Sequence, residues 1–390
     1  MQGNRSGNYV TRVFEGMDTI APPLWDGLLA QQPAPTPFMR HAYLSAMDCS
    51  GSACTGTGWT LRLITLWQDD RLAAACPVYL KSHSRGEYVF DWAWAEAYEQ
   101  HGLAYYPKAL VAPPFTPVPG SRLLAVDEPA RDALVQALLA WCEAAQLPSL
   151  HILFADEADR AACARAGMMQ RNQVQFHWQN AGWQDFEAFL ASLNQEKRKK
   201  IRQERRKVRD AGITFRTLLG QDMTPADWAF MQRCYQQTYW EHGNPPYLQT
   251  GFFEGMRQDM PDNWLLFVGE HAGRPMAMSL IGLQRDADGR PEVAYGRYWG
   301  ALARVDCLHF EACYYQPIAW CIANGVQRFE GGAQGEHKMA RALLPTPTAS
   351  MHWLAHPGFA EAVQRFLDRE SQGIGAYMDA LGQHSPLKRP

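Results

Sequence analysis

The sequence predicts an α+β protein of two similar lobes, each a small sheet packed against helices. The chain has 390 residues, which exceeds the length of about 250–300 residues at which a single hydrophobic core stops growing. A second observation is that each half repeats one order of apolar runs: a hairpin, a third strand, an amphipathic helix and one further strand. Antiparallel strands followed by a helix that crosses to one more strand are typical of helices packed on a sheet.

The hairpins are the clearest elements of this repeat. In the first half, residues 59–67 and 72–80 are apolar runs separated by a short polar turn. In the second half, residues 264–270 and 275–283 have the same arrangement. Short apolar runs on either side of a small polar turn are typical of a β-hairpin.

The remaining elements of the repeat follow in the same order in both halves. Each third strand is aromatic with a central charged residue, and each helix carries the tripeptide Ala-Trp-Cys near its end. The third strands are expected at 88–94 and 293–299, the helices at 129–145 and 308–323, and the last strands at 149–154 and 326–330. A chance likeness between short α/β segments is the alternative interpretation.

The domain boundaries follow from this repeat. We expect an N-terminal domain at 1–183, a basic connecting helix at 184–212, and a C-terminal domain with C-terminal helices at 213–390. Residues 185–211 contain no helix breaker and carry a narrow apolar stripe, which predicts one helix. Two helical stretches are expected after Pro357.

Composition and missing motifs exclude several classes of protein. The net charge of −3 gives no bulk attraction to nucleic acid, and no apolar run approaches the roughly 18 residues of a membrane span. Nine cysteines without a C-x-x-C pair, and no signal-peptide core at the start, predict a soluble cytoplasmic protein. The chain has no Gly-rich phosphate loop, G-x-G-x-x-G, G-x-S-x-G or H-E-x-x-H, and its histidines lack metal-ligand spacing, so no metal is expected.

Polar residues concentrate at the end of the last predicted strand, in residues 329–338 (FEGGAQGEHK). Three glycines there allow positive φ or a close approach of the backbone to a ligand. A polar surface turn is one interpretation, and an active-site loop is the other because loops at strand ends often carry function. The polar side chains of this loop are Glu330, Gln334, Glu336, His337 and Lys338.

The first half has a second polar segment, residues 81–94 (KSHSRGEYVFDWAW). The matching strand of the second half carries Arg297 where this one carries Asp91. We therefore expect the first half to contribute an acceptor or ligand pocket, by analogy with duplicated proteins that divide binding between their copies. The expected pocket residues are Lys81, Glu87, Tyr88 and Asp91.

Residues 197–209 (KRKKIRQERRKVR) form a strongly basic run in an acidic protein. A solvated helix face is one interpretation. The other is a docking face for an anionic substrate, an anionic lipid headgroup or RNA phosphates, including those of a tRNA. No aromatic residue is interleaved, so base stacking is not indicated.

Several of these segments resemble the FemAB-like bacterial proteins, described as predicted N-acyltransferases or peptidoglycan biosynthesis/recognition proteins of the GNAT superfamily. The resemblance covers roughly residues 10 to 370 and implies two tandem GNAT-like domains with mixed sheets flanked by helices. The segments that carry it are GEYVFDWAWAEAY (86–98), YYPKALVAPPFTPVPGSRLL (105–124), KRKKIRQERRKV (197–208), YGRYWGA (295–301), LHFEACYYQPI (308–318) and FEGGAQGEHK (329–338).

The resemblance implies transfer of an acyl or aminoacyl group to an amine. Fem ligases take the group from aminoacyl-tRNA and ordinary GNAT enzymes take it from acyl-CoA, so either is a possible co-substrate and no tightly bound cofactor is expected. The junction at residues 298–306 departs from the Q/R-x-x-G-x-G/A loop of GNAT enzymes, which puts standard binding of the CoA pyrophosphate in doubt.

Direct acyl transfer requires a base, donors for the oxyanion and a dry slot that aligns the reactants, but no covalent nucleophile. Tyrosines, including Tyr314, are candidates to protonate a leaving group, and Arg297 and Lys338 to neutralise an anionic group. The candidate catalytic residues are Glu330, His337, Glu311, His309 and Tyr298. The candidate substrate-binding residues are Arg297, Gln334, Lys338 and Tyr315, together with the four of the first half.

The sequence therefore favours a GNAT-type N-acyltransferase that acts on an amine of a small molecule or cell-wall precursor. The alternative is a non-catalytic protein that uses the duplicated fold to bind peptidoglycan or a peptide. An RNA-binding module is a third interpretation, which the acidic net charge and the lack of stacking residues weaken. The oligomeric state stays open.

Overall fold

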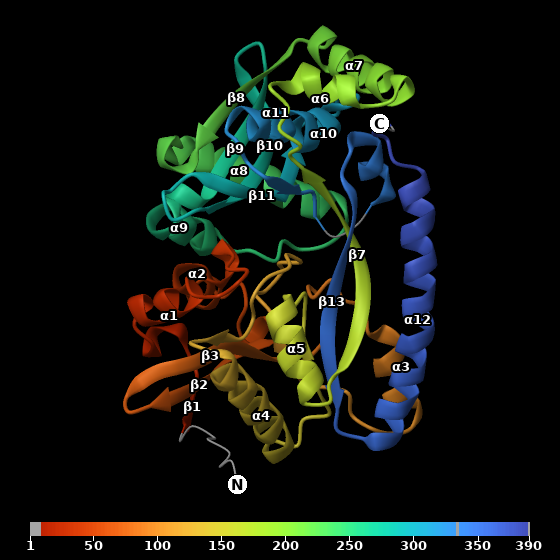
Figure 1. The fold of residues 1–390 in the computed structure, drawn as a ribbon. Coiled ribbons are helices and arrows are strands. Elements are labelled where there is room, and N and C mark those ends of the chain that lie inside the picture. Colours follow the sequence, from red (N-terminus) through yellow and green to blue (C-terminus); the bar gives the residue numbers. More distant parts are fainter. Residues whose placement is uncertain (1–8, 333–334, 389–390) are drawn as a thin grey trace. The chain divides into compact units, whose positions relative to one another are not determined.

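A computed structural model describes residues 9–332 and 335–388 of the chain. Contacts divide the chain into two compact units: unit 1 comprises residues 1–173 and 347–376, and unit 2 comprises residues 174–346 and 377–390. Each unit is a mixed sheet with helices, drawn in Figure 1. Each unit consists of two separate stretches of the chain, whereas the sequence analysis predicted continuous domains. The predicted domain boundaries therefore stay a prediction.

Unit 1 contains a hairpin, a parallel pair and the helices that cover them. Its strands are β1 (Val10–Phe14), β2 (Trp59–Gln68), β3 (Arg71–Lys81), β4 (Lys108–Val111), β5 (Leu124–Ala125) and β6 (Ser149–Ile152), with the adjoining parts of β7 (Met169–Gln179) and β13 (Leu344–Leu354). Its helices are α1 (Pro22–Leu29), α2 (His41–Cys49), α3 (Trp92–Gln100), α4 (Glu128–Ala144), α5 (Glu157–Arg165) and most of α12 (Pro357–Gln383).

Unit 2 has the same kinds of element. Its strands are β8 (Ile213–Leu219), β9 (Trp264–His271), β10 (Arg274–Arg285), β11 (Pro291–Ala301) and β12 (Arg328–Glu330). Its helices are α6 (Phe186–Ser192), α7 (Gln195–Asp210), α8 (Pro225–Glu241), α9 (Thr250–Asp259), α10 (Leu308–Phe310) and α11 (Gln316–Ala323). A π-helical segment, Glu311–Tyr315, joins α10 to α11, and a 3₁₀ helix, η7 (Glu336–Arg341), follows β12.

The pairing of strands repeats between the units, as the sequence predicts. In unit 1, β2–β3 and β3–β4 are antiparallel, and β4 then pairs parallel with β6 after α4 crosses over. In unit 2, β9–β10 and β10–β11 are antiparallel, and β11 pairs parallel with β12 after α10 and α11. The repeated order of elements is therefore confirmed.

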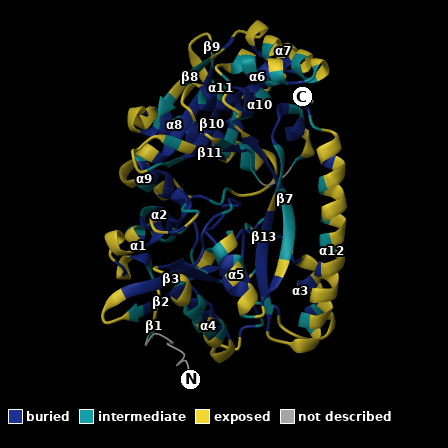
Figure 2. Cartoon of the chain, in the orientation of Figure 1, coloured by how far each residue is buried: buried dark blue, intermediate teal, exposed yellow. Residues whose placement is uncertain are grey.

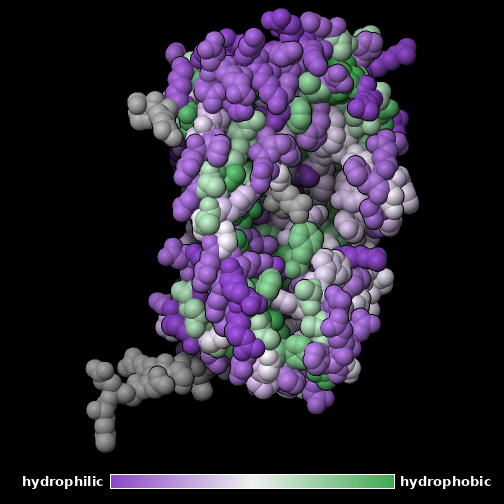
Figure 3. Space-filling model, turned by 90° about the vertical axis from the view of Figure 1, so that its right-hand side faces the viewer, coloured by the Kyte–Doolittle hydropathy of each residue, from purple (hydrophilic) through white to green (hydrophobic). Residues whose placement is uncertain are grey.

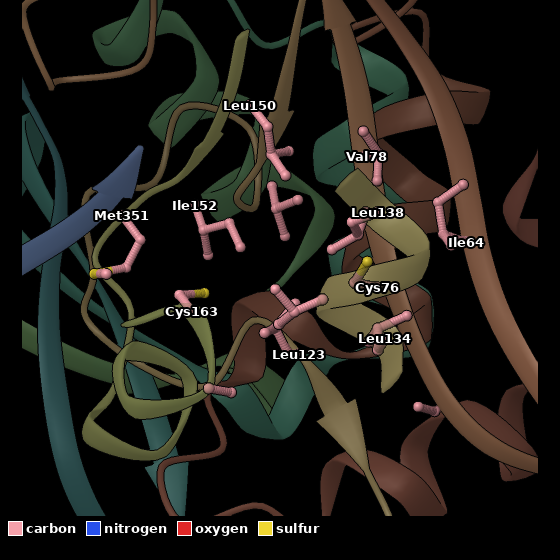
Figure 4. Packing of buried hydrophobic residues seen from close by; sticks show 14 of the residues in the cluster. Ile64, Cys76, Val78, Leu123, Leu134, Leu138, Leu150, Ile152, Cys163 and Met351 are labelled. Atoms are coloured by element: carbon pink, nitrogen blue, oxygen red, sulfur yellow. The ribbon is translucent and has the colours of Figure 1, made fainter. Parts of the chain in front are cut away.

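Each unit has its own buried core. In unit 1, the core lies between β2, β3, β6 and α4, where aliphatic side chains such as Ile64, Val78, Leu138 and Ile152 are fully buried (Figure 4). In unit 2, Trp178, Phe329 and Ile318 belong to a second cluster between the sheet and the helices. The strands are largely buried while the outer sides of α7 and α12 are exposed (Figure 2).

The third strand predicted at 88–94 is wrong. Tyr88 has φ of 62°, which turns the chain, and α3 begins at Trp92. The third strand of the repeat is β4, which pairs with both β3 and β6. The aromatic run misled the prediction because α3 uses Trp94 and Tyr98 to cover an aromatic cluster of unit 1.

Two helix predictions also need correction. The single helix predicted at 185–211 is two helices, because Leu193 and Asn194 are extended and Asn194 Oδ1 accepts a hydrogen bond from Lys197 N at 3.0 Å. Asparagine is among the strongest N-cap residues, so it starts a new helix there. The two stretches predicted after Pro357 are one helix, α12, which contains no proline after its first residue.

Candidate functional site

The parallel strands β11 and β12 of unit 2 separate at one point. They pair from Val293 to Tyr295 on β11, and β11 then continues along β10 to Ala301. The chain after β12 turns away through Gly331 and Gly332. A Cβ at residue 331 would lie 2.5 Å from a Leu343 side-chain carbon, so any other residue would force the Leu343 side chain to move.

Side chains from three elements gather at this separation, and we call His309, Tyr314, His337, Lys338 and Arg341 the divergence site. Tyr314 Oη lies 3.4 Å from His337 Nε2 in a hydrogen bond. The ring of His309 packs against Tyr314, with ring centroids 5.8 Å apart. Lys338 Nζ donates to the Gly332 carbonyl at 2.8 Å. The described residues of the predicted polar loop therefore lie beside α10 and the π-helical segment.

Burial sets the protonation of these groups. Burial lowers the pKa of Lys338 to about 8 and the pKa of His309 to about 4, and it lowers the pKa of His337 as well. Burial raises the pKa of Tyr314, so its phenol stays protonated. Near neutral pH the site holds two neutral imidazoles, an amine that is neutral in part and a phenol donor.

A second feature of unit 2 is a cleft of ≈ 300 Å³ next to the free end of β11. Arg297 is the extra residue of a β-bulge, because Gly296 pairs with Ile281 and Tyr298 already pairs with Leu280. Bulges re-aim side chains, and Arg297 and Tyr298 both face this cleft. The other lining residues are Tyr235, Thr238, Tyr239, His242, Asn244 and Trp299.

The cleft and the divergence site lie on opposite faces of β11. Tyr298 packs against Tyr235 of α8, so the next side chain, Trp299, projects from the other face of the sheet, where its ring lies 5.3 Å from the ring of His309, measured between centroids. Arg297 also donates a hydrogen bond from Nη2 to Tyr298 Oη at 3.3 Å. The cleft thus offers a guanidinium beside aromatic walls, on the face of β11 opposite the proton-transfer groups.

The structure does not bring all the predicted loop residues to this cleft. Glu330 is buried and accepts a hydrogen bond from Arg328 Nε at 2.9 Å, while His177 Nε2 lies 3.8 Å from it. Among the described residues, neither Glu330 nor His337 lines the cleft that contains Arg297 and Tyr298. Gln334 lies outside the described residues.

Glu311 and Tyr315 face α7 rather than each other. Arg205 Nε donates to both carboxylate oxygens of Glu311 at 3.2 Å, and Gln316 Nε2 donates to Oε1 at 2.7 Å. The hydroxyl of Tyr315 donates to Glu204, a buried carboxylate of α7. These contacts give both residues a structural role, which is to fix the π-helical segment on α7.

Two candidates of the first half, Glu87 and Asp91, contact a lysine that is absent from the predicted site residues. Lys108, the first residue of β4, is fully buried, and its Nζ donates to Glu87 Oε2 and Ser84 Oγ, each at 2.8 Å. Asp91 accepts from Lys108 and from Tyr105 Oη, the latter at 2.7 Å. The sequence does contain a sign of this cluster: Lys108 stands at the start of an apolar run, and a lysine that is buried there needs an anionic partner.

Burial and charge both act on this cluster. Burial raises the pKa of Glu87 to about 7 and lowers the pKa of Lys81 to about 7. Burial also acts to raise the pKa of Asp91, but the Lys108 ammonium outweighs it and holds that pKa below its usual range. Lys81 Nζ lies 3.5 Å from the centroid of the Trp59 ring. Tyr88 is half-buried, at the left-handed turn before Asp91.

The described residues give no sign of a metal centre or a membrane span. Within residues 9–332 and 335–388, no group of three His, Cys, Asp or Glu side chains has an arrangement that could hold a metal ion. None of the helices in that part of the chain is long and apolar enough to cross a membrane.

The chain is similar in fold to solved structures of low sequence identity. FemX superposes with a TM-score of 0.55 and 9% identity, covering 90% of this chain and 100% of FemX. L-PGS from Bacillus licheniformis superposes with a TM-score of 0.52 and 10% identity, covering 89% and 97% of the two chains. At these identities the likeness shows the fold, and it confirms the predicted α+β class with two GNAT-like domains.

No curated protein sequence matches the chain. A family model does: residues 16–389 match the FemAB-like model, which is described as peptidoglycan biosynthesis/recognition. This match covers nearly the whole chain and includes every segment that carried the resemblance in the sequence. The chain therefore belongs to the FemAB-like family of peptidoglycan biosynthesis/recognition proteins.

Proposed function

We propose that the protein transfers an acyl or aminoacyl group to an amine of a small molecule or cell-wall precursor, at the divergence site of unit 2. One observation carries the proposal: the Tyr314–His337 hydrogen bond and the buried Lys338 lie where β11 and β12 separate. The site combines neutral proton acceptors with a phenol donor, which is the set that amine acylation requires. Membership of the FemAB-like family supports the same assignment.

The reaction has a simple balance. The amine nitrogen attacks the acyl carbonyl, a C–N bond forms, and the carbonyl bond to the carrier oxygen or sulfur breaks. In the proposal, the imidazole of His337 takes the proton that the amine loses. The phenol of Tyr314 donates a hydrogen bond to the oxyanion and then a proton to the leaving atom, and the protonated His337 returns a proton to the Tyr314 oxygen to which it is hydrogen-bonded. The Lys338 amine, with a pKa of about 8, serves as a second base as the pH rises.

The cleft that contains Arg297 is the proposed place for the acceptor. Arg297 would bind a carboxylate or phosphate of the acceptor, and Tyr235 and Tyr239 would pack against its apolar part. In the proposal, the amine of an acceptor in the cleft reaches the divergence site, on the other face of the sheet, where β11 and β12 separate. The donor in this proposal is an acyl-CoA or an aminoacyl-tRNA that binds only as a co-substrate.

A non-catalytic binding protein is the second candidate, and one observation favours it. Two of the carboxylates with the potential to act as bases, Glu330 and Glu311, are engaged with Arg328 and Arg205. A carboxylate that is paired with a guanidinium is a weak proton acceptor, so these two residues are better suited to holding a binding site in a fixed shape than to proton transfer. This candidate predicts ligand binding without turnover.

A transfer assay separates the two candidates. The purified protein is incubated with peptidoglycan precursors and either acyl-CoA or aminoacyl-tRNA, and mass spectrometry follows the precursors. The transferase proposal predicts a precursor that gains the mass of one acyl or aminoacyl group, with one of the two donors. Precursor binding in native mass spectrometry, without any mass gain with either donor, would establish the binding protein instead.

We also infer that the protein works in the cytoplasm. All nine cysteines are free, and eight of them are buried or half-buried, without a disulfide. Free thiols in this number fit a reducing compartment. Cell fractionation checks the inference, and recovery of the native protein with an extracytoplasmic fraction would contradict it.

A further inference from the structure

Unit 1 contains an apolar groove between α3 and the first part of α12, which we call the helix groove. Its volume is ≈ 490 Å³, within the usual range of sites for small molecules. Figure 3 faces the side of the molecule on which both helices lie in Figure 1, and hydrophobic side chains reach the surface there between hydrophilic ones. None of the groups of the proposed transfer reaction lines this groove.

The helix groove exists because small residues stand where larger side chains would fill the space. Ala93 and Ala97 line it from α3, and His101, the residue that ends this helix, continues their four-residue spacing. Gly358 and Ala362 have the same spacing on α12. Residues four apart lie on one side of a helix, so each helix presents a low row of side chains to the groove.

One end of the groove carries two imidazoles. The rings of His101 and His356 both pack against Phe359, with centroids 5.3 and 5.2 Å from its ring. His101 Nδ1 lies 2.8 Å from the Ala97 carbonyl, which can only accept, so Nδ1 carries a proton and Nε2 is the nitrogen that can meet a ligand. Among the described residues that line the groove, no other side chain is ionisable.

The opposite end is bordered by a cation that already has its partner. The Arg171 guanidinium carbon lies 5.4 Å from the centroid of the Trp94 ring and 5.9 Å from that of Phe366, and both rings line the groove. Glu370 accepts two hydrogen bonds from Arg171, at 2.9 and 2.8 Å. The charge of Arg171 is therefore balanced within the protein, and this end offers a ligand mainly apolar contacts.

We propose that the helix groove binds a linear fatty acid, with the alkyl chain along the groove and the carboxylate at His101 and His356. Ionisable side chains at one end only match a ligand with a single terminal polar group. The charges are complementary, because both of these side chains are bases, and an anion favours the protonated imidazole, in which both nitrogens donate.

The dimensions and the surrounding charges favour a single chain over other occupants. From Ala93 to His101 the groove runs about 12 Å, at 1.5 Å per residue, which suits an alkyl chain better than a protein surface. The charged side chains of α3 are both acidic, Glu96 and Glu99, and would be repelled by an anionic bilayer. Every group in this inference belongs to unit 1, so it does not depend on the transfer reaction.

Calorimetric titration with octanoate, decanoate and dodecanoate, each below its micelle concentration, tests the proposal. Affinity should rise roughly threefold for each methylene from octanoate to decanoate, since each one removes apolar surface from water. Affinity that does not depend on chain length, or no binding of any of the three acids, would overturn the proposal.

Variants that fill the groove locate the binding. Ala362→Trp places a large side chain in the groove from α12, and Ala93→Trp does so from α3. Each should weaken dodecanoate binding about tenfold or more. The matched control is Ala376→Trp, at an exposed position of α12 outside the groove, which should bind as the wild type does. Circular dichroism checks the fold, and equal affinities in folded groove variants and control would refute the assignment.

A change of head group tests the role of the imidazoles. The wild type should bind dodecanoate about tenfold more tightly than dodecyltrimethylammonium, which has the same chain and the opposite charge. His101→Ala with His356→Ala should remove this preference, whereas His271→Ala, an exposed histidine of β9, should keep it. Equal affinity of the wild type for both compounds would contradict a carboxylate at the histidine end.

Two other occupants would give different results. A wild type that is dimeric in sedimentation, with a monomeric Ala362→Trp variant and no dodecanoate binding, would make the groove an interface between copies, and the proposal would fail. Binding to phosphatidylglycerol vesicles that Ala362→Trp abolishes, again without dodecanoate binding, would make it a membrane contact instead.

Discussion

Substitution of Lys338 by methionine should stabilise the protein at neutral pH. Lys338 is only 3% exposed, and burial lowers its pKa from 10.5 to about 8. At about 1.4 kcal/mol per pKa unit, a charged Lys338 costs the folded state about 3 kcal/mol at pH 7. Methionine has a similar volume and no charge, but it loses the hydrogen bond to the Gly332 carbonyl, which is worth about 1 kcal/mol. The net gain expected is about 2 kcal/mol.

The gain should depend on pH in a defined direction. The folded pKa of Lys338 lies below the unfolded pKa, so the cost of its charge is fully present below pH 8. This cost disappears as the pH rises from about 8 to 10.5, because the lysine is then neutral in both states. Above that range the variant should be slightly less stable than the wild type, since only the lost hydrogen bond remains.

Urea denaturation of both proteins at pH 7 and pH 10.5 measures this difference. Lys199→Met, at an exposed position on α7, is the matched control and should show no pH-dependent change. A Lys338→Met variant that is destabilised at pH 7, or whose advantage is the same at both pH values, would refute the account of a buried, strained ammonium.

Glu204→Gln should lower the free energy of unfolding by about 3 kcal/mol because it leaves the buried Arg341 guanidinium without its anion. The control, Glu196→Gln at an exposed position, should change this free energy by less than about 0.5 kcal/mol. Urea denaturation of both variants measures the difference. Lys108→Met should lower the same free energy by roughly 3–5 kcal/mol, since two buried carboxylates lose their cation, and a wild-type melting curve would contradict this. Arg297→Gln should raise KM for an anionic acceptor about tenfold or more and leave kcat nearly unchanged. Steady-state kinetics measures both values, and an unchanged KM would contradict the role of Arg297 in binding the acceptor.

The role of the first half in binding the acceptor stays a prediction, and a purely structural role for the same residues is the alternative. Glu87 and Asp91 both bind Lys108, which is a sufficient reason for their burial. If they also bind the acceptor, conservative substitutions such as Glu87→Gln should raise KM more than they lower kcat. A loss of stability with KM unchanged would assign the cluster to folding alone.

Local patterns in the sequence were sufficient for most elements of the fold. Alternating and helical periodicities identified β2, β3, β9, β10, β11 and α4 because each element depends on its own apolar face. The aromatic run at 88–94 satisfies the same pattern, but it becomes a turn and α3. Only the distant pairing of β4 with β3 and β6 determines which segment is the strand.

The candidate site was predictable in part. The glycine-rich loop after β12 pointed to His337 and Lys338, which do lie together with Tyr314. The partners of these residues could not be read from the sequence, because they come from far along the chain. Arg341 meets Glu204 across 137 residues, and such a pair leaves no mark in any local spacing.

The most direct test of the central claim is the kcat of His337→Gln in the transfer assay, at saturating donor and acceptor. The exposed His271→Gln on β9 is the matched control. If His337 takes the proton from the amine, kcat should fall by about 10²–10⁴-fold while the control retains wild-type turnover. A wild-type kcat in His337→Gln would contradict the assignment of the chemistry to the divergence site.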